Sequence, residues 1–81
     1  MRVIRSSHFE RNYAKAPDYV RRTFDKQSCL LAENLRHPSL CAKKYDEGAG
    51  LWQARVNQDW RFYFYIHGDI YYIVDIIPHP K

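Results

Sequence analysis

Three segments rich in β-branched and aromatic residues follow one another in the second half of the 81-residue chain. They span Leu51–Val56, Trp60–Ile66 and Ile70–Ile77, and only Asn57-Gln58-Asp59 and His67-Gly68-Asp69 separate them. Because the connectors consist largely of turn-forming residues, the segments predict consecutive antiparallel strands. This half of the chain is therefore expected to form a β-meander.

The first half of the chain predicts one short strand and two helices. Val3–Phe9 alternates partially and predicts the strand, and Glu10–Ala16 predicts a short helix that Pro17 ends. A second helix is expected over Asp18–Arg36, where apolar residues recur on one stripe at helical spacing: Val20, Phe24, Leu31 and Leu35. Residues 1–81 are therefore predicted to form a single α+β domain of order β-α-α-β-β-β, with a two-helix hairpin packed on one face of a twisted antiparallel sheet.

Strand alternation divides the side chains of the first two β segments between two faces. With the first turn centred on Gln58, Arg55 lies opposite Arg61, and Gln53 lies opposite Tyr63. The other face is apolar and is expected to meet the helices; it carries Trp52, Ala54, Val56, Trp60, Phe62 and Phe64. Two arginines directly opposite each other repel, so an acidic neighbour or a bound anion is needed to relieve the repulsion.

The sequence leaves both ways of relieving that repulsion open. A second turn centred on Gly68 would place Asp75 across from Arg61 as an ordinary cross-strand pair. A two-residue turn would instead reverse the faces of the third strand. Binding of a phosphate is favoured over the ion pair, because Arg55 would still lack a partner.

Further residues of the same half fit a site for a nucleic-acid phosphate backbone. Lys43 and Lys44 precede the strand of Arg55, and His79 follows the last strand, where an imidazole can transfer a proton near neutral pH. The tyrosines expected on the arginine face, where a ring can stack on a base, are Tyr63, Tyr65 and Tyr71, whereas Tyr72 is expected to point the other way. The alternative for the lysines and for His79 is simple exposure to solvent.

Composition narrows the class of partner. The formal charge of +4 favours an anionic partner, either nucleic acid or an acidic protein segment. The histidines and the two cysteines, Cys29 and Cys41, lack metal-ligand spacing, so no metal or other cofactor is predicted. Met1–Glu10 carries charges where a signal peptide needs an apolar run, and no apolar stretch reaches transmembrane length. A cytoplasmic protein without a membrane partner is therefore expected.

The order of these features resembles the RelE/ParE superfamily of bacterial type II toxins. The resemblance covers nearly the whole chain, and its most specific part is the Trp-x-x-Arg-Val stretch of Trp52–Val56, which runs into Asp59–Phe64. The remaining pieces are Leu35-Arg36-His37-Pro38, Lys43-Lys44 and the closing Asp75-Ile76-Ile77-Pro78-His79.

The resemblance implies a toxin that a cognate antitoxin neutralises. RelE-like members cut messenger RNA in the ribosomal A site without a metal, because the 2′-hydroxyl of the RNA attacks the adjacent phosphate. That chemistry needs a base near the hydroxyl, positive charge for the phosphorane and an acid for the leaving oxygen. The expected partners are therefore the antitoxin, the ribosome and messenger RNA.

Site residues are carried over by position. Arg61 resembles the strand arginine that holds the phosphate, and Arg55 resembles the basic position before it. Lys43 or Lys44 takes the place of the loop lysine, and His79 matches the position after the last strand where ribonuclease members often have His or Arg. The expected catalytic residues are Arg61, His79 and Arg55; the expected RNA-binding residues are Lys43, Lys44, Arg55, Tyr63 and Tyr65.

Two departures from the ribonuclease pattern keep other functions open. Many RNA-cutting members carry a tyrosine shortly after the last basic residue, whereas this sequence ends at Lys81, and no glutamate stands out as the base. One alternative is a ParE-like inhibitor of DNA gyrase, which needs no catalytic groups. The other is a non-catalytic RNA-binding or interaction module.

Overall fold

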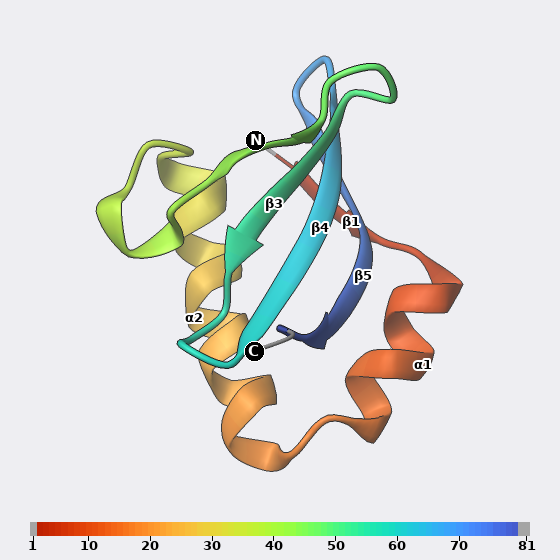
Figure 1. The fold of residues 1–81 in the computed structure, drawn as a ribbon, viewed down its shortest axis with the longest axis vertical. Coiled ribbons are helices and arrows are strands. Elements are labelled where there is room, and N and C mark those ends of the chain that lie inside the picture. Colours follow the sequence, from red (N-terminus) through yellow and green to blue (C-terminus); the bar gives the residue numbers. More distant parts are fainter. Residues whose placement is uncertain (1, 80–81) are drawn as a thin grey trace.

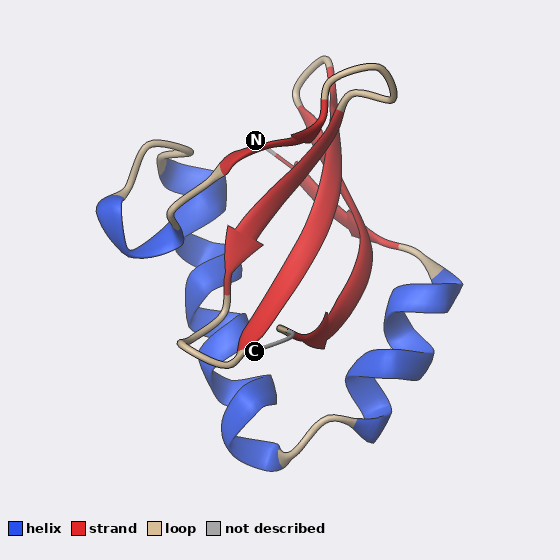
Figure 2. Ribbon diagram, in the orientation of Figure 1, coloured by secondary structure: helices blue, strands red, loops and turns tan. Residues whose placement is uncertain are grey.

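The chain adopts the predicted α+β arrangement of two helices packed on a twisted, mostly antiparallel sheet (Figures 1 and 2). The computed structural model describes residues 2–79, so Lys81 lies outside it. The elements are β1 (Arg2–Arg5), α1 (Ser7–Lys15), α2 (Asp18–Glu33), a 3-10 helix η1 (Pro38–Leu40), β2 (Lys43–Asp46), β3 (Leu51–Arg55), β4 (Trp60–His67) and β5 (Ile70–Pro78). The described strands form one sheet in the order β1-β5-β4-β3-β2, in which only β1 and β5 run parallel.

Strand β2 was not predicted, because its sequence does not alternate. All four residues of Lys43–Asp46 are exposed, and the strand lies at the edge of the sheet, where it pairs with β3 alone. Charged residues are common on such edges because they discourage pairing with another chain. The backbone reverses after Asp46, whose carboxylate accepts a hydrogen bond from the Ala49 amide at 3.1 Å.

Three boundaries in the first half were wrong, because the first helix also begins at Ser7 instead of Glu10. The predicted strand Val3–Phe9 ends at Arg5, because Ser6 caps α1: its hydroxyl oxygen accepts the Phe9 amide at 3.0 Å. The second helix ends at Glu33 instead of Arg36, since Asn34 is already extended.

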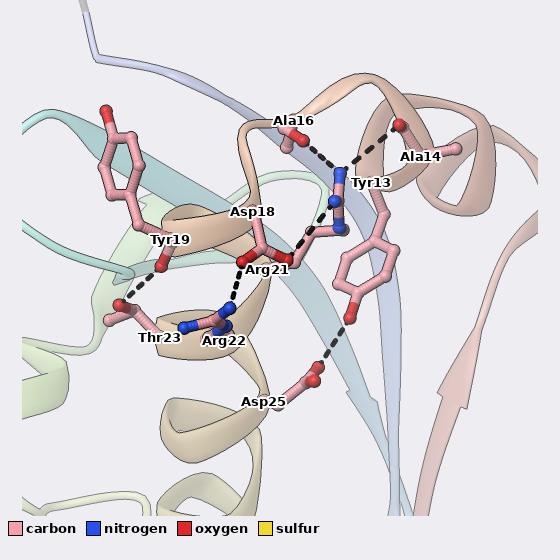
Figure 3. Close-up of polar contacts among 9 residues, drawn as sticks. All are labelled: Tyr13, Ala14, Ala16, Asp18, Tyr19, Arg21, Arg22, Thr23 and Asp25. Carbon is pink, nitrogen blue, oxygen red and sulfur yellow. Dashed lines mark hydrogen bonds and ion pairs between the residues drawn. The ribbon is translucent and has the colours of Figure 1, made fainter.

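Polar contacts fix the connection between the two helices (Figure 3). Arg21 of α2 donates to the carbonyl of Ala16, before Pro17, and lies 3.4 Å from Asp18. The Tyr13 hydroxyl of α1 donates to Asp25 of α2 at 2.9 Å. These bonds hold α1 beside β5 while α2 packs on the sheet (Figure 1).

The core lies between the helices and the apolar face of the sheet, as predicted. Phe24 of α2 packs edge-on against Phe62 at 5.1 Å between ring centroids, and Phe9 of α1 lies 4.9 Å from Phe24. Ala54, Val56, Phe62 and Phe64 of the predicted apolar face are buried, and Trp52 and Trp60 pack against them. This burial confirms the face assignment of β3 and β4.

The register between β4 and β5 corrects the prediction for the last strand. The turn has two residues, Gly68 and Asp69, so His67 pairs with Ile70 instead of the turn centring on Gly68. Gly68 has φ +62°, a left-handed conformation that suits glycine. As a result Tyr71 is buried in the core and Tyr72 is exposed, which reverses the predicted orientations of both.

A β-bulge at Val74 then shifts the register by one further residue. Phe64 pairs with Ile73, but Tyr63 pairs with Asp75. Arg61 consequently lies opposite Ile77, so the Arg61–Asp75 cross-strand pair that the sequence allowed does not form. Asp75 instead accepts a hydrogen bond from Asn12 at 2.6 Å and lies 3.3 Å from His8, both on α1.

Candidate functional site

A cationic cavity of about 320 Å³ opens on the face of the sheet that carries the arginines. It is lined by Cys41, Lys43, Gln53, Arg55, Arg61 and His79. Four of the predicted site residues, Lys43, Arg55, Arg61 and His79, are thus brought together from four separate segments of the chain. The pairing of Lys43 with Gln53 on β2–β3 and of Arg55 with Arg61 on β3–β4 places them side by side.

The β3–β4 loop holds Arg61 in place. Its Nη1 donates to the carbonyls of Asn57, Gln58 and Trp60 at 2.7, 3.3 and 3.0 Å. The Asn57 side chain shapes the loop by accepting the amides of Asp59 and Trp60, both at 2.9 Å. Within residues 2–79 only Nη1 of Arg61 forms hydrogen bonds, so Nε and Nη2 keep donors for an anion.

Arg55 pairs with Arg61 across β3 and β4, and no carboxylate of residues 2–79 lines the cavity that they share. Its closest polar contact from Nη1 is the Cys41 sulfur at 3.9 Å. The ion pairs of the described chain are Arg5–Glu10, His8–Asp75, Arg21–Asp18 and Arg22–Asp18, so neither arginine of the cavity belongs to one. The cavity therefore gathers positive charge, and its planar guanidinium groups can donate paired hydrogen bonds to a phosphate.

Gln27 of α2 forms hydrogen bonds with two segments that lead into this cavity, and the sequence did not predict this role. The side chain is 5% exposed, and its Nε2 donates to the carbonyls of Ser39 and Arg55 at 3.0 and 2.9 Å. It thereby joins the helix to the end of β3 and to the segment before Cys41. The available signal was its position on the helical stripe of Val20, Phe24 and Leu31, where a polar residue is buried.

Three predicted RNA-binding residues lie outside the cavity. Lys44 pairs with Trp52 and points to the opposite face, where its ammonium lies 5.5 Å from the indole ring centroid. Tyr63 is buried, and its hydroxyl accepts a hydrogen bond from Gln53 at 2.9 Å. Tyr65 is exposed and lines the neighbouring groove.

That groove is larger than the cavity, with a volume of about 620 Å³, and lies on the same face of the sheet. It is lined by Ser6, His8, Tyr45, Leu51, Tyr63, Tyr65, Val74, Asp75 and Ile77. Tyr45 of the unpredicted strand β2 packs edge-on against Tyr63 at 5.1 Å between ring centroids. The groove was missed because its walls depend on β2 and on the bulge in β5.

Within residues 2–79 no three His, Cys, Asp or Glu side chains gather closely enough to hold a metal ion. No helix in that range is long and apolar enough to span a membrane.

Burial raises the pKa of the Tyr71 hydroxyl, and burial together with Asp25 raises the pKa of Tyr13; neither tyrosine lines the cavity.

Comparison with known proteins places this geometry in a fold class. No protein-family model matches the sequence, and no curated protein matches it significantly. Solved structures do match: the RelE–RelB complex of the archaeon Pyrococcus horikoshii OT3 superposes with a TM-score of 0.80 at 18% identity, over 99% of this chain and 96% of the other. The chain therefore has the fold of the RelE/ParE toxins, as the resemblance implied.

Particular toxins with this fold are equally similar. The YoeB/ParE toxin from Agrobacterium tumefaciens has a TM-score of 0.79 at 12% identity and covers 99% of this chain and 100% of its own. YafQ from Escherichia coli has a TM-score of 0.79 at 17% identity, with 98% and 94% covered. YafQ is also solved with DinJ as a toxin–antitoxin complex.

Proposed function

We propose that this protein is the toxin of a type II toxin–antitoxin system and acts as a metal-independent endonuclease on ribosome-bound messenger RNA. The observation that carries the proposal is the cavity in which Lys43, Arg55, Arg61 and His79 converge on the open face of a RelE/ParE toxin fold. A protein that used this face for stability alone would not place two arginines opposite each other without a carboxylate.

The cavity supplies two of the three groups that the reaction needs. The 2′-oxygen bonds to phosphorus while the bond from phosphorus to O5′ breaks; the 2′-hydroxyl proton passes to water, and His79 gives a proton to O5′. Arg61 and Arg55 donate to the phosphoryl oxygens as negative charge grows on them. No carboxylate lines the cavity in the described chain, so charge stabilisation, and not a strong base, is expected to supply most of the rate.

The proposed protein partner is a cognate antitoxin. Structural neighbours include RelE in complex with RelB and YafQ in complex with DinJ. The formal charge of +4 and the unpaired arginines of the cavity suit an acidic or amphipathic segment.

Single-turnover cleavage of ribosome-bound message by purified protein tests the nuclease. Arg61→Ala should lower the rate on the order of a hundredfold or more, because its charge is used fully only in the transition state. His79→Gln should also slow cleavage, and a chelator should leave the rate unchanged. Lys26→Ala, which removes an exposed lysine of α2, is the matched control and should cleave at the wild-type rate.

Circular dichroism would establish that each variant is folded. A wild-type rate for folded Arg61→Ala would remove Arg61 from the mechanism. If induction of the protein produced gyrase-linked DNA breaks and no codon-phased cuts in messages, the gyrase-inhibitor alternative would replace the nuclease.

A further inference from the structure

The groove and the cationic cavity share one wall. Gln53 lines the cavity and donates to the hydroxyl of Tyr63, which lines the groove. Arg61 lines the cavity, and its cross-strand partner Ile77 lines the groove. Residues 61 and 63 of β4 are about 7 Å apart along the strand. A phosphate in the cavity would therefore have the groove directly beside it.

Two exposed aromatic rings, Tyr45 and Tyr65, line the groove. Tyr45 is 60% exposed and Tyr65 is 37% exposed, although both belong to a sheet face rather than to a loop. Tyr72, which pairs with Tyr65 across β4 and β5, is also exposed. Exposed rings beside a cationic cavity match the alternation of bases and phosphates in a single strand, because every base can stack on an aromatic ring.

A histidine of fixed orientation stands at the wall of this groove. His8 lies in the first turn of α1, and its Nε2 lies 3.3 Å from the Asp75 carboxylate. Asp75 is itself held, since it accepts Asn12 at 2.6 Å and the Ile76 amide at 2.8 Å. Asn12 Nδ2 also lies 3.5 Å from Nε2, but Asp75 is nearer and its carboxylate can only accept. A neutral ring that bonds to Asp75 therefore carries its proton on Nε2, and Nδ1 is then the acceptor.

We propose that the groove binds the base of the nucleotide next to the phosphate in the cavity, and that His8 reads this base through Nδ1. An acceptor here favours the exocyclic amino groups of adenine, cytosine and guanine over uracil, whose one base donor, N3–H, lies between two carbonyl oxygens that repel the imidazole lone pair. His8 is thus a specificity-determining residue, and Asp75 and Asn12 are its positioning residues. This inference rests on the proposed function, because the phosphate in the cavity sets which nucleotide reaches the groove.

An apolar groove could also receive side chains of a protein partner. A nucleotide is favoured because, among residues 2–79, no carboxylate lines the cavity that the groove joins, and because the groove contains an oriented imidazole acceptor. Apolar side chains of a protein would leave that acceptor without a donor.

The test separates the groove from the cavity by using different probes on the ¹⁵N-labelled full chain. Inorganic phosphate should shift amide resonances around Arg55, Arg61 and His79. Adenosine, cytidine and uridine, which carry no phosphate, should shift resonances around His8 and Tyr65, with uridine binding about fivefold more weakly, as expected for one weakened hydrogen bond.

Variants identify the residue that discriminates. His8→Phe should bring adenosine and cytidine to the affinity of uridine, whereas His8→Gln, which keeps a carbonyl acceptor, should retain part of the preference. Tyr65→Ala should lower the affinity of the groove for all three nucleosides. His67→Phe, at an exposed histidine near the β4–β5 turn and outside the groove, is the matched control and should bind like the wild type.

The outcomes are distinct for the two proposals. Equal affinity for the three nucleosides, or an unchanged preference in folded His8→Phe, overturns the role of His8 while the phosphate response can still support the nuclease. If phosphate shifts no resonances around the cavity, the nuclease proposal is contradicted. Resonance shifts in the groove that differ between the nucleosides would then still support recognition of the base by His8. A groove that responds to no nucleoside overturns the inference and favours a protein occupant.

Discussion

Gln27 allows a sharp test of how the helix layer supports the cavity. Its amide donates to the carbonyls of Ser39 and Arg55, and the Ser39 hydroxyl donates back to Oε1 at 3.4 Å. Arg55 lies beyond the pairing of β2 with β3, which begins at Lys43–Gln53. Gln27 therefore takes the place of a strand partner for the Arg55 carbonyl.

Gln27→Leu removes both donors while keeping a side chain of similar size. The two carbonyls are part-buried, so leaving them unsatisfied costs up to about 6 kcal/mol together, and the buried leucine offsets about 2 kcal/mol of that. The expected net loss is up to about 4 kcal/mol, which a domain with an unfolding free energy of about 5–15 kcal/mol can survive. The phosphate affinity of the cavity should fall as well, because both carbonyls belong to segments that form its walls.

Urea unfolding followed by circular dichroism measures the stability term, and a phosphate titration followed by NMR measures the second effect. Lys26→Ala, at an exposed neighbouring position on α2, is the control and should change stability by less than about 0.5 kcal/mol. A Gln27→Leu protein that matched this control in both measurements would refute the supporting role.

Three further predictions concern the core, alkaline pH and the arginine pair. Phe64, fully buried between Trp52 and Tyr71, should cost about 3–5 kcal/mol in urea unfolding when changed to Ala, whereas Tyr19→Ala at an exposed site should cost little; a Phe64→Ala loss below about 1 kcal/mol would contradict the face assignment. Burial raises the pKa of Tyr71 above 10.0, so this tyrosine ionises at a lower pH in the unfolded chain than in the folded one. Its contribution to the unfolding free energy is therefore present below about pH 10 and is lost as the pH rises through the pKa of the folded protein. Tyr71→Phe should flatten the fall in unfolding free energy between about pH 9 and 11, and an identical pH profile would count against that burial. Arg55→Gln should raise the unfolding free energy by about 0.2–1 kcal/mol and reduce the gain in Tm that phosphate gives over chloride at equal ionic strength; equal gains in both proteins would argue against an anion between the arginines.

The faces of β3 and β4 could be predicted from sequence because alternation has a period of two and their turn keeps both strands in step. The same rule failed on β5, where the two-residue turn and the extra residue Val74 each shift the pairing by one position. Neither shift has a signature in the sequence beyond Gly68. Tyr71 and Tyr72 exchanged faces for this reason, and Asp75 moved from Arg61 to Tyr63.

The candidate site divided in a similar way. Arg55 and Arg61 follow directly from alternation on predicted strands, so their pairing was correct. Lys43 and Lys44 could not be separated, because the strand that sends them to opposite faces was not recognised. Gln27 was accessible in principle, since it interrupts an apolar stripe, but its two carbonyl partners come from segments whose positions depend on tertiary packing.

Hydrogen bonds from other parts of the fold hold the arginine pair, and the repulsion between the two arginines gives a reason for them. Two like charges held opposite each other destabilise a sheet, and the strands would separate or the side chains would swing apart if their backbones were free. Instead two carbonyls of the β3–β4 loop and the Trp60 carbonyl hold the Arg61 guanidinium, and a buried glutamine from α2 holds the Arg55 carbonyl. Hydrogen bonds that keep an unfavourable pair in register are expected where a fold gives up stability for binding. We therefore expect the ligand of this face to be an anion that relieves the repulsion, and the proposed phosphate with a stacked base beside it would occupy both the cavity and the groove.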